Sequence, residues 1–306
     1  MGVAAALALV ACGGDDGSTE ATTPSSTSTT EDEATGRADL TALPLGDQNA
    51  AGEPTRGALY ACNTNFDPNA PGAQAAGPWI DEEAGTWDAT QKVTVRGTVD
   101  QSGEVSLAVE DDHQEVSGNG LPTTPTGEFP VAADDPAAAY DANPNTIAGY
   151  DLDVQLPASP EVASEPSCVG GTVGVSVLGV PIFSAFDAGG RDAVAREVQD
   201  QCDGHPQQSG QYHFHSRSSC FTEEEGLFGY ALDGFGIYTE TDEDGEPLTT
   251  ADLDECHGRS GEVLWHGERV EIYHYVATAD FPYTVGCFTG TPITSATGLQ
   301  LGPAPG

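Results

Sequence analysis

The amino-acid sequence predicts a mainly β protein: a single β-rich domain, stapled by disulfides, with an internal duplication and one short helix. Three observations favour this fold class. Several segments alternate apolar and polar residues, which is typical of half-buried strands. The chain has seven cysteines, of which Cys12 lies in a signal-like segment at the amino terminus, and the even number that remains suits a disulfide framework. Two stretches of the chain also carry the same motifs in the same order.

The amino-terminal residues resemble a bacterial lipoprotein signal. An apolar run over residues 3–11 ends in Leu9-Val10-Ala11-Cys12-Gly13, where small residues precede a cysteine as in a lipobox. The run is too short to span a bilayer. We therefore expect residues 1–12 to be a signal peptide and Cys12 to be lipidated. The protein would then be exported and held to the membrane by this lipid, at the cell surface or in the periplasm. An ordinary cleaved signal is the alternative.

A polar segment follows the signal. Residues 13–56 are rich in Ser, Thr, Asp, Glu, Gly and Pro and poor in aliphatic residues. Such a segment buries too little apolar surface to offset the conformational entropy lost on folding. We expect it to be a disordered stalk, so that the folded domain comprises residues 57–306.

Alternating segments mark the strands. Residues 92–99 and 105–109 alternate and are joined by turn residues, so we predict that they form a hairpin. Residues 150–156 alternate in the same way and form a further strand. One short helix is expected at about 190–202, where apolar residues recur at helical spacing.

The second half of the chain contains the duplication. Each copy runs through a glycine-centred hairpin, an Asp-x-Cys-x-Gly turn, a Tyr-His-aromatic strand and a further cysteine. The matched segments are 174–183 with 229–238, 200–204 with 254–258, and 212–215 with 273–276. Three ordered matches at a nearly constant offset argue against coincidence.

The cysteines are expected to form three disulfides. The chain has seven, and with Cys12 lipidated an even number remains in an oxidising compartment. The simplest pairing places one disulfide in each copy and one in the amino half: Cys202–Cys220, Cys256–Cys287 and Cys62–Cys168. Exchange between the copies stays open, because six cysteines allow many pairings.

Histidines gather in the duplicated region. Six of the seven fall between residues 205 and 274. On a strand, His213 and His215 point to one face, and His274 lies likewise between Tyr273 and Tyr275. If the two copies pack about a pseudo-twofold axis, these three imidazoles converge and suit zinc, copper or iron. The alternative is a half-buried strand whose outer histidines bond only to backbone or water.

The candidate site residues follow from this arrangement. The expected inner metal ligands are His213, His215 and His274, with His205 and His257 as helpers. The acidic residues expected to assist them are Asp187, Asp233, Asp254 and Glu255. In an enzyme, Asp233 or Glu255 would act as the general base beside a metal-held water.

These motifs resemble the YHYH-domain family of exported bacterial proteins. The resemblance rests on Gln211-Tyr212-His213-Phe214-His215, on the hairpin at 229–238 and on the turn at 253–258. It covers about 93–290, with its core at 170–290. It implies no established reaction. The second copy departs from the first, because Val276 stands where the first copy has His215.

Charge and missing signatures narrow the function. The chain has 49 acidic and 9 basic residues, a formal net charge of −40, which repels phosphate backbones and excludes nucleic-acid binding. No nucleophile elbow, His-Glu-x-x-His motif, phosphate loop or dinucleotide fingerprint occurs. Three functions stay open: a metal-binding surface domain, a non-catalytic binding or structural module, and a metal-dependent hydrolase or oxidoreductase.

Overall fold

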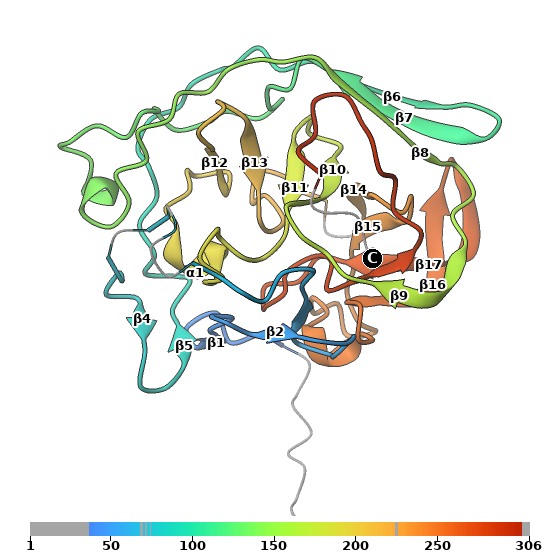
Figure 1. Ribbon diagram of the computed structural model, residues 1–306, viewed down its shortest axis with the longest axis horizontal. Helices are drawn as coiled ribbons and strands as arrows, with labels where there is room; N and C mark the ends of the chain where they lie inside the picture. Colours follow the sequence, from blue (N-terminus) through green and yellow to red (C-terminus); the bar gives the residue numbers. More distant parts are fainter. Residues whose placement is uncertain (1–36, 68–69, 71, 74, 224–225, 302–306) are drawn as a thin grey trace, which may run out of the picture. The chain divides into compact units, whose positions relative to one another are not determined.

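The computed structural model (Figure 1) describes most of the chain: residues 37–67, 70, 72–73, 75–223 and 226–301. The expected signal peptide, its Cys12 and the stalk up to residue 36 lie outside these residues. The chain separates into residues 1–33 and residues 34–306, and the fold described here is that of the second unit. Within the described part, no helix has the length and apolarity that a membrane crossing requires.

An eight-stranded sheet forms the centre of the domain, which confirms the predicted β class (Figure 1). Its strand order is β12-β13-β11-β10-β14-β15-β17-β16. The strands are β10 (Thr172–Ser176), β11 (Pro181–Phe183), β12 (Gly204–Pro206), β13 (Tyr212–Phe214), β14 (Gly226–Ala231), β15 (Gly236–Thr239), β16 (Gly258–Trp265) and β17 (Glu268–Val276).

Smaller elements surround this sheet. A second sheet of β6 (Val105–Val109), β7 (His113–Gly118) and β8 (Leu152–Pro157) packs on one face, where Val116 and Val154 share a buried cluster with Val175 and Tyr230. The remaining strands are β1 (Leu43–Pro44), β2 (Ala50–Ala51), β3 (Leu59–Tyr60), β4 (Ile80–Asp81), β5 (Thr86–Trp87), β9 (Val162–Ser167) and β18 (Phe288–Gly290). The described helices are α1 (Ala193–Arg196) and two 3₁₀ turns, Pro136–Ala139 and Thr250–Asp252.

The sequence duplication builds the large sheet. Each copy supplies a hairpin, a strand parallel to the hairpin's second strand, and an outer antiparallel strand: β10, β11, β13 and β12, then β14, β15, β17 and β16. The copies meet at the antiparallel pair β10–β14, whose register is centred on Val175 opposite Tyr230. These two residues are equivalent in the repeat. A local twofold axis therefore passes between them, perpendicular to the sheet.

The two copies agree in detail as well as in strand order. Ile182 pairs with Phe214 in the first copy, and Ile237 pairs with Tyr275 in the second. All four side chains are buried in the main core, on the face opposite the smaller sheet. The aromatic residues of the Tyr-His-aromatic motif therefore pack inward, as predicted from the period of the strand.

An aspartate organises the same turn in each copy. The carboxylate of Asp200 accepts a hydrogen bond from the Tyr212 hydroxyl at 2.9 Å, and that of Asp254 accepts one from the Tyr273 hydroxyl at 3.2 Å. Backbone donors complete both sets: Gly127 and Cys202 in the first copy, Cys256 and Gly258 in the second. The disulfides formed are Cys202–Cys220, Cys256–Cys287 and Cys62–Cys168, the same three pairs as in the simplest pairing.

One predicted element forms in a shorter version and another does not form. The expected helix at about 190–202 is the single turn α1, capped by Asp192, and Glu197 continues in an extended conformation (φ −80°, ψ 147°). The expected hairpin of 92–99 with 105–109 does not form, since β6 pairs with β7 instead. Val95 instead forms a parallel β-bridge with Asp200, so the backbones of residues 92–99 and 190–202 bond to each other.

The stalk boundary is also wrong. Residues 37–56 belong to the domain: Leu43 is 2% exposed within the main core, and β1 pairs with β5. The backbone N–H of Gly46 donates to the buried carboxylate of Asp192. A few apolar side chains and long-range hydrogen bonds order this polar segment, and its average composition hides them.

His257 lies in the turn before β16 and is buried, so the stability of the domain should depend on the protonation of its ring. It has a positive φ of 72°, is 2% exposed, and its Nε2 lies 3.0 Å from Thr278 Oγ1. Burial lowers the pKa of His257 to about 3. The folded state therefore holds this ring neutral, and its contribution to stability is present above about pH 6.5 and is lost as the pH falls towards 3.

We predict that wild type loses stability relative to His257→Asn by about 1.4 kcal/mol per pH unit below about pH 6. Asparagine tolerates the left-handed conformation and does not titrate. Urea unfolding between pH 7 and pH 4 measures the difference. His113→Asn is the control, because the carboxylate of Asp112 raises the pKa of His113 and reverses the sign. Parallel curves for wild type and His257→Asn would contradict the prediction.

Candidate metal site

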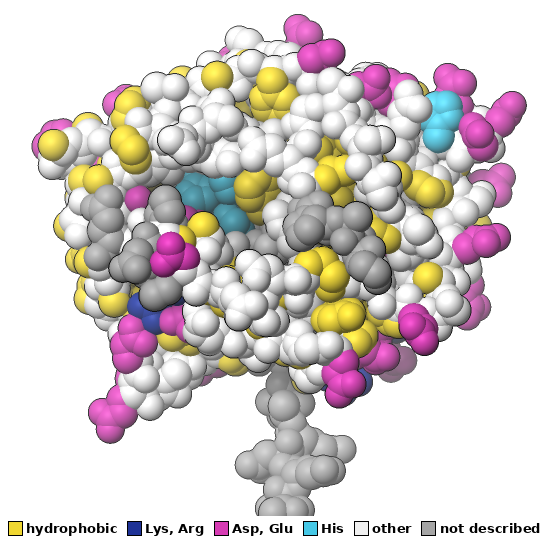
Figure 2. Space-filling model, viewed as in Figure 1, with side chains coloured by type: hydrophobic (Ala, Val, Ile, Leu, Met, Phe, Trp, Pro, Cys, Tyr) yellow, Lys and Arg dark blue, Asp and Glu magenta, His cyan; other side chains and the backbone are white. Residues whose placement is uncertain are grey.

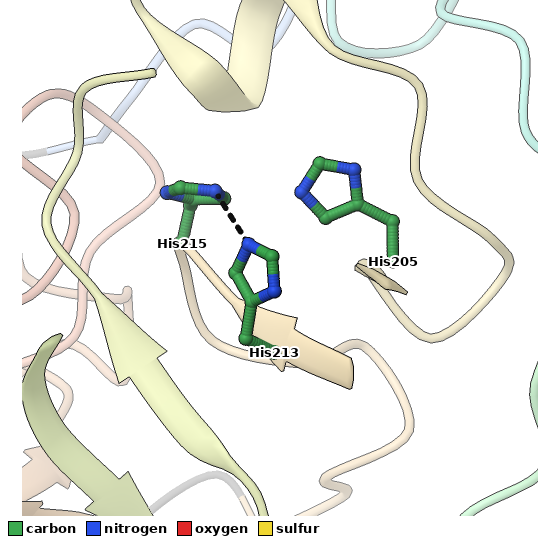
Figure 3. A group of neighbouring side chains, drawn as sticks. All are labelled: His205, His213 and His215. Atoms are coloured by element: carbon green, nitrogen blue, oxygen red, sulfur yellow. Dashed lines mark hydrogen bonds between the residues drawn. The ribbon is translucent and has the colours of Figure 1, made fainter. Parts of the chain in front are cut away.

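Three buried imidazoles lie close together at the edge of the large sheet formed by the first copy (Figure 3). His205 on β12 lies directly opposite His213 on β13, and His215 follows on the same face as His213. Each is 3% exposed, and one ring nitrogen from each lies within 4.8 Å of the others. The antiparallel register brings the first two together, and the period of two along the strand brings the third.

Backbone carbonyls orient two of the rings. His213 Nδ1 lies 3.2 Å from the Gln211 carbonyl oxygen, and His215 Nδ1 lies 2.7 Å from that of Ser184. A carbonyl oxygen only accepts, so each Nδ1 carries the proton and each Nε2 presents a lone pair. The two Nε2 atoms lie 3.1 Å apart. Metal-binding histidines in proteins are typically oriented by this kind of Nδ1 hydrogen bond.

A carboxylate completes the group. Glu197 Oε2 lies 3.5 Å from His215 Nε2 and 3.6 Å from His205 Nε2, and the Glu197 side chain is 13% exposed. Burial raises the pKa of Glu197 to about 8, and the negative charges of Asp187 and Asp141 act in the same direction. The surroundings of this carboxylate therefore favour a nearby positive charge.

Glu197 is a site residue that the sequence does not reveal. It lies inside the segment assigned to a helix, and no motif distinguishes it from the other acidic residues. Its position depends on the end of α1 at Arg196, after which the extended backbone turns its side chain towards the imidazoles. Lys92 holds this segment, since its ammonium group donates to the Val194 carbonyl and to Gln199 Oε1.

The three imidazoles are neutral near pH 7. Burial lowers the pKa of His215 to about 4 and lowers the pKa of His205 and of His213 well below the usual range. The neutral ring is the form that binds metals. Phe183 stacks on His213 with ring centroids 4.0 Å apart and fixes that ring from the side. Figure 2 shows histidine side chains at the bottom of a hollow over β12 and β13.

The prediction that His274 joins His213 and His215 is wrong. The copies lie side by side in one sheet, and the strands β11, β10, β14 and β15 separate β13 from β17. In the second copy, His274 Nδ1 faces the Ile272 carbonyl at 3.0 Å, and Nε2 lies 3.0 Å from Glu240 Oε1. His257 is also outside the group, in the turn before β16.

None of the four acidic helpers belongs to the histidine group of the described residues. Asp187 pairs with Arg191 at 2.6 Å, and Asp254 holds the turn before β16. Asp233 accepts a hydrogen bond from the Tyr275 hydroxyl at 2.6 Å, and Glu255 is exposed. Asp187, Asp254 and Asp233 serve the fold, because their carboxylates satisfy nearby donors rather than face the imidazoles.

Comparison with known proteins gives one match. Residues 153–247 match the family described as YHYH protein. No curated protein and no solved structure matches the chain. The matched segment runs from β8 to just beyond β15, so it contains the three histidines, Glu197 and the first hairpin of the second copy. Residues 153–247 of the chain are therefore similar to the YHYH protein family.

Proposed function

We propose that the protein binds one divalent transition metal ion through His205, His213 and His215, with Glu197 as the fourth donor. The distances support four donors around one ion. Three of the separations between these donors are 3.1, 3.5 and 3.6 Å. Donors of a tetrahedral zinc site, each about 2.0–2.1 Å from the ion, are about 3.3 Å apart.

The facing lone pairs of His213 Nε2 and His215 Nε2 are the observation that favours a bound metal over histidines that only pack. Two neutral rings whose Nδ1 atoms both donate to carbonyls cannot hydrogen-bond to each other through Nε2. Neither nitrogen of His205 has a hydrogen-bond partner among the residues that the structure describes. Buried polar atoms without partners are costly. One cation would satisfy the three imidazoles and the carboxylate together.

The donor set limits the metal. Imidazole nitrogen and carboxylate oxygen suit zinc, copper and iron, the three metals expected from the sequence. Two functions follow from such a centre: metal binding itself, and metal-dependent hydrolysis or oxidoreduction. The hollow above the site (Figure 2) is the observation that favours a catalytic role, since a catalytic metal needs an open coordination position. We place metal binding first, because the positions of all four donors support it directly.

We also propose that the protein is exported and lipid-anchored to the membrane through Cys12. Three disulfides are typical of an oxidising compartment and support export. The resemblance of residues 9–13 to a lipobox supports the lipid anchor, since a chain with a formal net charge of −40 is repelled by anionic lipid head groups. The anchor would hold the metal site at the cell surface or in the periplasm.

Metal binding is tested on protein purified without a histidine tag and stripped with a chelator. We predict that wild type takes up one equivalent of zinc, and that an excess of about 100 Kd stabilises it by about 2.7 kcal/mol. His213→Ala with His215→Ala removes both effects, whereas His274→Ala, the matched histidine of the second copy, retains them. Equilibrium dialysis and thermal unfolding measure them. Equal losses in both variants, or no uptake by wild type, would refute the proposal.

The anchor is tested by fractionation of the producing bacterium. Wild type is expected in the membrane fraction with an acylated Cys12, and Cys12→Ser is expected to lose the acyl group and the membrane association. Mass spectrometry of the mature amino terminus identifies the modification. A wild-type protein that is released without acylation would show that an ordinary signal is cleaved instead.

A further inference from the structure

The second copy repeats the framework of the metal site. In the first copy, His205 lies opposite His213 across the antiparallel pair β12–β13. In the second, Arg259 lies opposite His274 across β16–β17. The local twofold axis through the β10–β14 pair relates the two positions. Arg259 therefore stands where the first copy has an imidazole ligand.

The surroundings of the two strand histidines also agree. His274 Nδ1 faces the Ile272 carbonyl at 3.0 Å, as His213 Nδ1 faces its own i−2 carbonyl. The ring of Tyr238 contacts His274 with centroids 5.4 Å apart, and Phe183, which holds the equivalent hairpin position, contacts His213. His274 Nε2 is thus oriented for a ligand in the same way as His213 Nε2.

A carboxylate again faces the imidazole. Glu240 Oε1 lies 3.0 Å from His274 Nε2, and Glu240 Oε2 is buried without a hydrogen-bond partner among the described residues. The guanidinium of Arg259 lies 3.9 Å from this second oxygen. Glu240 comes from the end of β15, whereas Glu197 follows α1, so the two copies supply the carboxylate from different elements.

Two residues separate the second framework from a metal site. Arg259 brings a fixed positive charge to the position of His205, and a guanidinium does not deprotonate to become a ligand. Val276 replaces His215 and is buried in an apolar cluster with Leu248 and Leu253. Arg259 and Glu240 line a cleft of about 760 Å³, whereas His274 is fully buried behind them. The orientation of His274 therefore does not keep a metal out.

We propose that the second copy is a silenced metal site, and that Arg259 silences it. Its guanidinium neutralises Glu240 in place of a metal ion and repels a dication from His274. The inference rests on the proposed function only in taking the first copy as the template. It assigns one metal ion, rather than two, to each chain, and it identifies the residue that sets this number.

The experiment uses the full chain with the first site disabled by His213→Ala and His215→Ala. Adding Arg259→His to this background supplies a second imidazole beside His274 and Glu240 and removes the positive charge. Arg259 is a safe position to change, since its side chain is 44% exposed. Arg259→Lys keeps the charge, and Arg259→Gln removes it without adding a ligand. Cobalt(II) and zinc are the probes, with equilibrium dialysis and the cobalt visible spectrum as readouts.

The Arg259→His chain is expected to bind one equivalent, at least about tenfold more tightly than the Arg259→Gln chain. The Arg259→Lys chain is expected to bind none. Val276→His, added to Arg259→His, should tighten binding further where thermal unfolding shows an intact domain. If the Arg259→His chain is folded and binds no better than the Arg259→Lys chain, the inference is overturned.

The two proposals fail separately. If wild type binds no metal but the Arg259→His chain with the first site disabled binds one equivalent, the proposed function fails, and the role of Arg259 in keeping a metal out of the second copy stands. If wild type binds one equivalent and Arg259→His in the otherwise wild-type chain still binds one, the proposed function stands and the inference fails. Adding His274→Ala to the Arg259→His chain must abolish the new site.

Discussion

The antiparallel pairing of β10 with β14 joins the two copies into one sheet, and the positions of all the candidate ligands depend on it. Because this pair lies at the centre, the parallel and outer strands of each copy lie at opposite ends of the sheet. The histidine faces of β13 and β17 cannot meet in such an arrangement. Each copy must instead complete a site from its own strands, and only the first copy has three imidazoles to do so.

The buried core and the polar site use opposite faces of the same short strands. In β13, the side chains of Tyr212 and Phe214 are buried in the main core, and His213 points the other way. The hydroxyl of Tyr212 binds Asp200, which holds the turn that leads into β12 and therefore into His205. Packing, turn geometry and ligand position are thus coupled through a few residues. The second copy keeps this coupling and changes the chemistry, with Arg259 at the position of His205.

Patterns that lie within one segment of the sequence could be predicted, and partners chosen by the tertiary fold could not. The duplication predicted two matching units, each with a hairpin and a Tyr-His-aromatic strand, and the strand at 150–156 is β8 within two residues. The hairpin at 92–99 failed because alternation does not specify which strand is the partner. His205 is expected only as a helper, because no alternation in the sequence marks β12, a three-residue edge strand that ends at Pro206. Glu197 depends on where a one-turn helix ends, for which the sequence gives no local signal.

X-ray absorption spectroscopy of the zinc-loaded wild-type chain tests the metal centre most directly. The arrangement of His205, His213, His215 and Glu197 predicts a first shell of about four nitrogen and oxygen atoms at about 2.0–2.1 Å, with the outer-shell scattering of three imidazoles. His205→Ala should remove one imidazole from that pattern. A shell of water oxygens without imidazole scattering would contradict a metal centre built from the first copy of the repeat.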